Sequence, residues 1–222
     1  MSNEWCTPDW LFKELNKEFN FDIDLCATRE NSKCDTYCTD YLNNEYQQIS
    51  EPFLHPGKIV FESREPLPFE KLLGAYREDN FVCFMNPPYS NPKPFIEKAW
   101  EDSKHCKIVC LVKCDPSTKW WSTFWDYDNK SRGSKPGCKV RFFPKRIQFD
   151  PPMELVTSGG VWKLKNKWVQ KCENCIEGTV PSEGWGSGHF CHSCKGKSYK
   201  PLSGPNFSCA LIIMDRRSYQ SE

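Results

Sequence analysis

The chain has 222 residues, of which 38% are hydrophobic, and its 30 basic and 29 acidic side chains leave a net charge of +1. This length allows one α/β domain with an appendage or two small domains, and the apolar content supports a packed core rather than a disordered chain. No stretch is apolar enough for a secretory signal or a membrane span, so the sequence predicts no membrane partner.

The charges are unevenly distributed along the chain. Residues 1–103 hold 10 basic against 19 acidic side chains, residues 104–149 hold 11 against 3, and residues 150–222 hold 9 against 7. The basic middle segment favours a polyanionic partner, although solvated surface lysines would give the same count.

The fourteen cysteines are scattered rather than arranged as a disulfide framework. A chain of this size does not need such a framework, so we expect a reducing, cytoplasmic environment with most thiols buried as small hydrophobic side chains. Four of the cysteines form a separate pattern, described below.

The first predicted helix begins at Thr7-Pro8-Asp9. A capping threonine, a proline at the first helical position and an acid near the positive end of the helix dipole are typical of a helix start. Apolar residues at helical spacing then give one hydrophobic face, formed by Leu11, Phe12, Leu15 and Phe19.

Residues 21–27 indicate a short strand with Asp24 near its C-terminal end. Ligands of open α/β sheets bind beyond the carboxyl ends of the strands, so Asp24, followed by the small Cys26 and Ala27, is a candidate cofactor contact. Taken alone, such an acid is more often a structural cap. No glycine-rich fingerprint follows, so nothing here indicates a nicotinamide dinucleotide.

The next strand, predicted at residues 81–85, stops at Asn86-Pro87-Pro88-Tyr89. The prolines stiffen the loop and donate no hydrogen bond to a sheet. Such a loop holds one amide, one or two bare carbonyls and an aromatic ring in fixed relation. This set suits a flat ring that bears an amine, although a proline-terminated edge strand would also explain it.

The other elements alternate between strand and helix, which predicts a doubly wound α/β fold. Residues 43–80, with four prolines, are expected to form an irregular excursion with a short helix near residues 70–75. The remaining elements expected are a helix at 94–104, a strand at 107–112, a helix from 115 that holds several tryptophans, strand pieces at 139–143 and 146–149, and a last core strand at 207–214.

Two C-x-x-C pairs, Cys172/Cys175 and Cys191/Cys194, are separated by fifteen residues and follow a predicted β-ribbon at 162–169. This spacing predicts a closed, tetrahedral zinc site rather than disulfides or free thiols. Iron fits the same ligands, and His189 or His192 could replace one of them. Since a core strand follows, we expect residues 151–204 to form a zinc-binding module inserted between a core at 1–150 and a final segment at 205–222.

Taken in order, several motifs resemble those of the phage-type DNA N6-adenine methyltransferases of the Dam-like group. The early ones are Trp5-x-Thr7-Pro8, Asp24-x-Cys26-Ala27, Asn31-x-Lys33-Cys34 and Asn86-Pro87-Pro88-Tyr89-Ser90, and the later ones are Trp120-Trp121, Arg146-Ile147-x-Phe149 and Pro205-x-Phe207 to Met214. Residues 1–42, 81–150 and 204–214 carry the resemblance, while residues 43–80 and the zinc-binding module look like additions.

The resemblance implies a Rossmann-like methyltransferase sheet, S-adenosylmethionine as methyl donor and double-stranded DNA as partner, in the bacterial host cytoplasm if a phage encodes the protein. By similarity, the cofactor would be bordered by Trp5, Thr7, Pro8, Asp24, Cys26, Ala27 and Asn86. A flipped adenine would be bound by Asn86, Pro87, Pro88 and Tyr89.

The same loop also occurs in methyltransferases that act on RNA guanine, on the cytosine N4 amine or on protein glutamine. The Thr-Pro helix start and the strand at 207–214 favour the DNA adenine enzyme over these alternatives. A zinc-bearing nucleic-acid binding module without activity is a further alternative.

Overall fold

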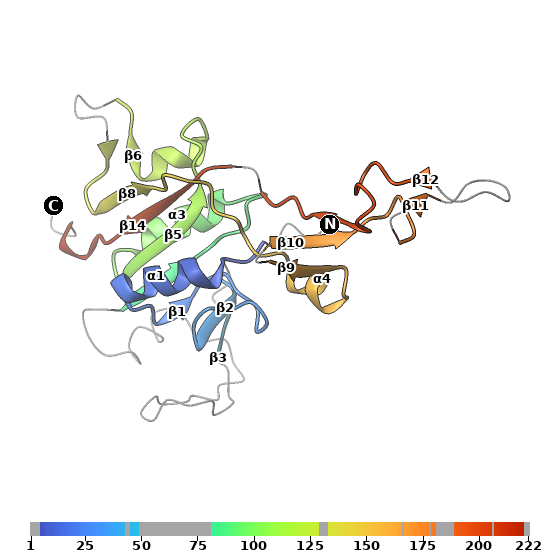
Figure 1. The fold of residues 1–222 in the computed structure, drawn as a ribbon. Coiled ribbons are helices and arrows are strands. Elements are labelled where there is room, and N and C mark those ends of the chain that lie inside the picture. The colour runs from blue at the N-terminus through green and yellow to red at the C-terminus, as the bar shows by residue number, and fades with distance from the viewer. Residues whose placement is uncertain are drawn as a thin grey trace. The chain divides into compact units, whose positions relative to one another are not determined.

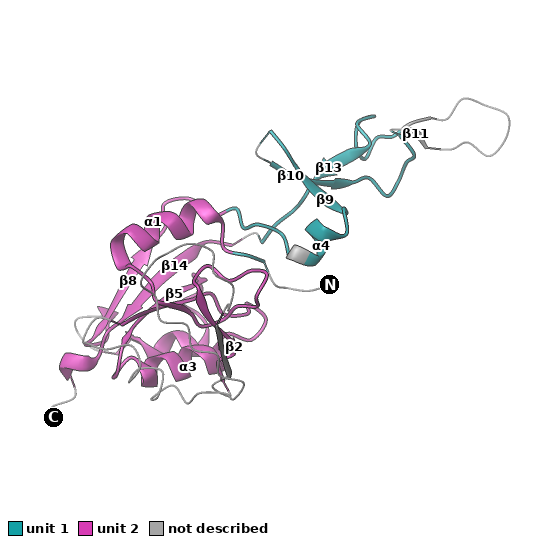
Figure 2. Cartoon of the chain, turned by 90° about the horizontal axis from the view of Figure 1, so that it is seen from below, with its two compact units in different colours: residues 1–6, 148–206 teal, residues 7–147, 207–222 magenta. Residues whose placement is uncertain are grey.

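The computed structural model describes residues 5–42, 45–48, 81–128, 133–165, 167–177, 179–180, 189–205 and 207–219. The helix predicted near residues 70–75 lies outside the described residues. The chain divides into a larger unit, residues 7–147 and 207–222, and a smaller unit, residues 1–6 and 148–206 (Figure 2). Residues 1–6, which the sequence analysis assigns to the core, group with the smaller unit because Cys6 pairs with Asp150 through two backbone hydrogen bonds.

A seven-stranded sheet forms the larger unit, in the order β3-β2-β1-β4-β5-β14-β8 (Figure 1). Its strands are β1 (Ile23–Asp24), β2 (Thr36–Asp40), β3 (Glu45–Gln48), β4 (Val82–Met85), β5 (Lys107–Lys113), β8 (Cys138–Phe142) and β14 (Cys209–Met214). The strands β2, β1, β4 and β5 are parallel neighbours, and β14 lies antiparallel between β5 and β8. The fold is therefore mixed α/β with a mostly parallel sheet, as the alternation of elements predicts.

Two helices, α1 (Asp9–Phe19) and α3 (Lys93–Asp102), lie on opposite faces of this sheet (Figures 1 and 2). Phe12 of α1 packs against Phe84 of β4 and against Phe21, with ring centroids 5.4 and 5.6 Å apart. On the other face, Ile96 and Ala99 of α3 are completely buried. Because successive side chains of a strand point to opposite faces, β4 contacts α1 through Phe84 and joins the opposite core through Cys83 and Met85.

Short elements complete the larger unit. They are the 3₁₀ helices η1 (Lys119–Thr123) and η2 (Arg217–Tyr219) and the strand pair β6 (Trp125–Asp126) and β7 (Gly133–Ser134). In the described part of the chain, no helix is long and apolar enough to cross a membrane.

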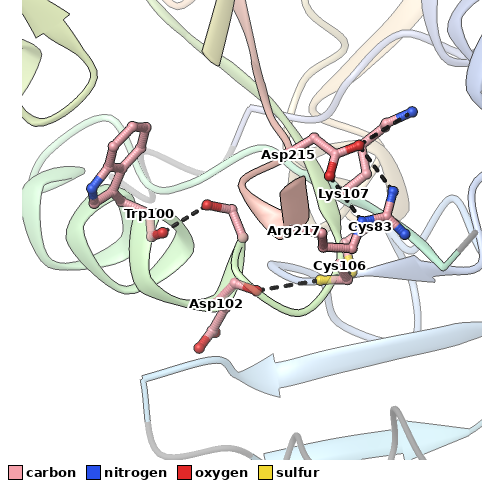
Figure 3. A network of polar contacts seen from close by, with 8 residues as sticks. Cys83, Trp100, Asp102, Cys106, Lys107, Asp215 and Arg217 are labelled. Carbon is pink, nitrogen blue, oxygen red and sulfur yellow. Dashed lines mark hydrogen bonds and ion pairs between the residues drawn. The ribbon is translucent and has the colours of Figure 1, made fainter. Parts of the chain in front are cut away.

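A polar network joins the amino end of β5 to the chain that follows β14 (Figure 3). Asp215 accepts hydrogen bonds from Arg217 at 2.8 and 2.9 Å, and Lys107, the first residue of β5, lies 3.7 Å from the same carboxylate. Beside it, the Cys83 and Cys106 sulfur atoms are 3.7 Å apart. This network fixes the edge of the sheet opposite the one at which β4 ends.

The smaller unit contains a three-stranded antiparallel sheet in the order β13-β10-β9. Its elements are α4 (Met153–Thr157), β9 (Val161–Leu164), β10 (Lys167–Lys171), β13 (Tyr199–Pro201) and the strand pair β11 (Thr179–Val180) and β12 (His189–Phe190). The β-ribbon predicted at residues 162–169 is therefore present, as β9 and β10.

Several sequence expectations differ from the structure. Pro8, not Thr7, occupies the N-cap position of α1, and no side chain caps that helix. The helix expected from residue 115 is only the 3₁₀ helix η1. Residues 146–149 form no strand, whereas residues 45–48 of the excursion predicted to be irregular form β3.

Candidate active site

The candidate site lies where two neighbouring parallel strands end. Asp24, the last residue of β1, pairs in register with Phe84 of β4, and the Leu25 N–H donates to the Phe84 carbonyl at 2.8 Å. Asn86 follows two residues after Phe84. The pairing therefore brings Asp24 and Asn86 to the same carboxyl edge of the sheet, which is where open α/β sheets bind ligands.

The Asn-Pro-Pro-Tyr loop is held by its own side chains. The Tyr89 hydroxyl donates to Oδ1 of Asn86 at 2.8 Å, and the Tyr89 ring packs edge-on against Phe207 with centroids 4.8 Å apart. Asn86 and Tyr89 are half-buried, Pro87 is buried and Pro88 is exposed. Burial raises the pKa of Tyr89 well above its usual value, so the hydroxyl keeps its proton and remains a donor.

Asp24 is a buried carboxylate, with only 3% of its surface exposed. Its two oxygens accept the backbone N–H groups of Cys26 at 3.3 Å and Lys33 at 3.2 Å. Burial raises the pKa of Asp24 to about 6, while these two hydrogen bonds and the Lys33 charge act in the opposite direction. At neutral pH the group is therefore mostly ionised, with two fixed donors aimed at it.

Lys33 connects this carboxylate to the start of α1. Its backbone N–H binds Asp24, and its ammonium group lies 2.6 Å from the carboxylate of Asp9. Thr7 and Pro8, both buried, immediately precede Asp9. Lys33 thus links the Asp24 carboxylate, through its backbone, to the start of α1, through its side chain.

The structure gathers most of the predicted site residues at this edge. Cys26 is half-buried, and Ala27 is buried, with its N–H bound to the carbonyl of Cys38 on β2 at 3.1 Å. Trp5 belongs instead to the smaller unit, where a Cβ at Gly204 would lie 3.5 Å from its ring.

Two contacts at this edge are not predictable from the sequence motifs. Lys33 bridges Asp9 and Asp24, and Phe207 packs against Tyr89. Lys33 and Phe207 both lie in the motifs that resemble the Dam-like group, but each contact joins segments far apart in the chain, so the motifs alone assign neither residue a role.

A second candidate site is the cysteine cluster of the smaller unit. Cys172, Cys175, Cys191 and Cys194 are all buried, and their sulfur atoms lie within 4.8 Å of one another. Two sulfur–sulfur distances, Cys172 to Cys191 and Cys175 to Cys194, are 3.8 and 3.5 Å. A tetrahedral zinc ion with bonds of about 2.3 Å places its sulfur ligands about 3.8 Å apart, so the cluster fits such an ion.

The two C-x-x-C segments also contact each other through side chains other than the thiols. The Asn174 side chain donates to the Ser193 hydroxyl at 2.8 Å, between the cysteines of each pair. After Cys194 the chain turns through Lys195 and Gly196, both with positive φ, and the Gly196 N–H returns to the Cys191 carbonyl at 3.2 Å. The chain therefore makes a tight turn directly after the second pair of cysteines.

Comparisons with known proteins agree with one another. The Dam family, described as DNA N-6-adenine-methyltransferase, matches residues 1–57 and 70–131. A DNA N-6-adenine-methyltransferase of Haemophilus phage HP1 is 33% identical over 121 residues, which are 53% of this chain and 53% of the phage protein. One of Escherichia phage T1 is 25% identical over 120 residues, which are 53% of this chain and 39% of that protein.

No solved structure matches the chain significantly. The matched part spans about half or less of the length of these curated relatives. The family match includes the segments that carry Asp24 and the Asn-Pro-Pro-Tyr loop, and it ends before the cysteine cluster. The family match covers more than half of the residues of this chain, so the chain belongs to the Dam family of DNA N-6-adenine-methyltransferases.

Proposed function

We propose that the protein transfers a methyl group from S-adenosylmethionine to the N6 amine of adenine in double-stranded DNA. The observation that carries the proposal is the Asn-Pro-Pro-Tyr loop at the end of β4, beside a buried Asp24 at the end of β1, in a chain of this family. The relatives matched here bear the name of this activity.

The strand order supports a Rossmann-like methyltransferase sheet. Because β14 is antiparallel to both β5 and β8, β8 runs in the same direction as β5. Five of the seven strands, β2, β1, β4, β5 and β8, thus share one direction, and the last strand in the chain is inserted against them.

S-adenosylmethionine, when bound, supplies a methyl group on a positively charged sulfur. Its binding site would be formed by Asp24, Cys26 and Ala27 after β1, by Thr7 and Pro8 at the start of α1, and by Asn86. The ionised, buried Asp24 is suited to accept hydrogen bonds from ligand hydroxyl groups or to face a cationic group.

The loop residues would bind and orient an adenine that has been flipped out of the duplex. Oδ1 of Asn86 and the Pro87 carbonyl would accept hydrogen bonds from the N6 amine and draw its lone pair out of conjugation with the ring. Tyr89 would stack on the base, and Pro88 stiffens the loop. Asn86 is a neutral acceptor and takes no proton, so these residues act through orientation and electrostatics.

We further propose that the four-cysteine cluster holds a structural zinc ion and that residues 151–204 act as an inserted zinc-binding module. Four thiolates complete the coordination of the ion and leave no position open for catalysis. None of the fourteen cysteines is joined in a disulfide, which supports a reducing location such as the cytoplasm of a bacterial host.

The proposal is tested by incubating the protein with labelled S-adenosylmethionine and unmethylated duplex DNA, with RNA and protein as parallel acceptors. We expect the label in DNA as N6-methyladenine. Label in RNA or protein would be consistent with the chemistry proposed for the loop but would refute DNA as the substrate.

Asn86→Ala provides the matched variant for this assay. It removes one amine acceptor, and we expect turnover to fall by at least a hundredfold, as for other single polar groups at a reacting centre. Binding of S-adenosylmethionine, measured by calorimetry, should persist with at most a modest loss of affinity, because the other residues proposed for the cofactor site remain. An Asn86→Ala protein that still methylates DNA at the normal rate would refute the role of the loop.

A further inference from the structure

The charged side chains of the small antiparallel sheet are all lysines. The strands β9, β10 and β13 carry Lys163, Lys167, Lys171 and Lys200 and no acidic residue. A surface of one sign that is complementary to a polyanion is the usual electrostatic footprint of nucleic-acid binding.

The strand register assigns these lysines to two faces. Residues that pair across antiparallel strands share a face, and Lys167 pairs with Leu164, Val169 with Trp162, and Lys171 with Tyr199. One face therefore carries cations and aromatic rings together. We call it the lysine–tryptophan face, and it consists of Trp162, Leu164, Lys167, Val169, Lys171, Tyr199 and Pro201.

Side chains of the opposite face make contacts within the smaller unit. There Lys163 lies 3.9 Å from the carboxylate of Asp150 and 4.8 Å from the centre of the Trp168 ring. The Trp168 indole N–H donates to the same Asp150 at 2.5 Å. Lys163 thus has a partner within the fold.

Most of the lysine–tryptophan face is exposed instead, although Val169 at its centre is buried and Tyr199 is half-buried. Lys167 and Lys171 are exposed, and Trp162 and Leu164 expose 38% and 37% of their surface. Within the described residues, no carboxylate pairs with Lys167 or Lys171. Trp162 and Tyr199 pack edge-on, with centroids 6.2 Å apart, which holds both rings in place between the lysines.

We propose that the lysine–tryptophan face binds the phosphate backbone of duplex DNA. Two ammonium groups, an indole N–H and a phenol hydroxyl are donors of the kind that position proteins on phosphates. A protein partner fits less well, because lysine is depleted at the centres of protein–protein interfaces. The inference rests on the proposed function for the identity of the polyanion and adds a binding surface outside the methyltransferase site.

The test is equilibrium binding of the zinc-loaded, 222-residue chain to duplex DNA at several salt concentrations. The variant is Lys167→Gln combined with Lys171→Gln. We expect weaker binding and a plot of log K against log salt that is shallower by about 2, since each lost phosphate contact removes about 0.9 from the slope.

Two controls make the result specific. Lys13→Gln with Lys17→Gln changes the net charge equally on exposed positions of α1, and its slope should match that of the wild type. Lys167→Arg with Lys171→Arg keeps the charges and should keep the binding. Zinc content, measured for every variant, confirms that the smaller unit is intact.

An unchanged affinity and slope in the Lys167/Lys171 glutamine variant would overturn the inference, as would an equal loss in the α1 control. Either result leaves the proposed function standing if the wild type still methylates DNA. Wild-type protein that binds DNA through these lysines but transfers no methyl group would overturn the proposed function alone.

Discussion

Tyr89 fixes the amide of Asn86 at the end of β4. Its hydroxyl, kept protonated by burial, donates to Oδ1 of Asn86, and its ring packs edge-on against Phe207. An amide oxygen has two lone pairs, so this hydrogen bond orients the acceptor without by itself excluding a second donor. The tyrosine thus has a positioning role as well as the stacking role proposed for its ring.

Substitutions at Tyr89 separate these two roles. Tyr89→Phe keeps the ring and removes one hydrogen bond, so we expect single-turnover methyl transfer to slow about fivefold, corresponding to about 1 kcal/mol. Tyr89→Ala also removes stacking on the base and should slow transfer on the order of a hundredfold. Equal rates in the two variants would show that the ring contributes nothing.

Asp24 makes stability depend on pH. Its pKa rises from 3.8 to about 6 on folding because of burial, so the folded chain holds the proton more tightly than the unfolded chain. Its stabilising contribution is complete below about pH 4 and is lost as the pH rises towards 6. The loss amounts to about 3 kcal/mol, because one pKa unit is worth about 1.36 kcal/mol.

Urea unfolding of the wild type and of Asp24→Asn between pH 4 and 7 measures this effect. The unfolding free energy of the wild type should fall relative to that of the variant by about 3 kcal/mol across this range, and the difference should be constant above it. Other titrating groups are common to both proteins and cancel. Parallel pH profiles would contradict the raised pKa of Asp24.

The residues that could be predicted from the sequence are those whose local chemistry is unusual. Asn86-Pro87-Pro88-Tyr89 stands out because two prolines end an apolar strand. Lys33 and Phe207 could not be assigned roles, because their contacts with Asp9 and Tyr89 join positions that only the folded sheet brings together.

Helix α1 supports the site through a single aromatic cluster. Phe12 contacts both Phe21 and Phe84, and Phe84 precedes Asn86 by two residues on β4. The helix therefore packs on the strand that carries the candidate catalytic loop.

Phe12→Ala should destabilise the larger unit by about 3–5 kcal/mol, since it removes a buried ring and leaves a cavity. Trp10→Ala on the same helix removes a side chain that is 58% exposed and should change stability by less than about 0.5 kcal/mol. Thermal unfolding of both variants provides the comparison. Similar midpoints in the two proteins would show that the aromatic cluster does not anchor α1.

Elements with a clear hydrophobic period are predictable, and those set by local polar contacts are not. The helices α1 and α3 and the strands β5 and β14 lie within two residues of their predicted bounds. The helix expected from residue 115 is reduced to η1, and the Thr118 hydroxyl there binds the Asp115 carbonyl at 2.7 Å. Such side-chain bonds to the backbone compete with a regular helix.

Residues 146–149 show how burial can alternate without a strand. Ile147 and Phe149 are buried while Arg146 and Gln148 are exposed, which is the period-two pattern on which the strand prediction depended. No ladder forms here, and only the isolated bridge between Asp150 and Cys6 follows.

At the scale of the whole molecule, the two units differ in what holds them together. The larger unit has an extensive apolar core on both faces of its sheet. Among the described residues of the smaller unit, the buried apolar side chains other than the four cysteines of the cluster are Cys6, Phe149, Pro151, Pro152, Val161 and Val169. So small a core needs a further constraint, which the proposed zinc ion would supply.

Removal of the metal should therefore unfold only the smaller unit. We expect one zinc per chain by elemental analysis. Chelation or Cys172→Ser should increase hydrogen exchange in β9, β10 and β13, while amides in β5 and β14 stay protected. Cys114→Ser, a half-buried thiol of the larger unit, is the control that should retain zinc. Loss of protection in both units together would contradict this division.

The position of β14 has a consequence for biosynthesis. This strand lies between β5 and β8, yet the ribosome makes it only after the whole smaller unit has been translated. Until then a nascent chain leaves one backbone edge of the apolar strand β5 unpaired and leaves β8 without its partner. We therefore expect co-translational folding to stall at an incomplete sheet, and ribosome-bound chains that end before residue 209 should engage chaperones that longer chains release.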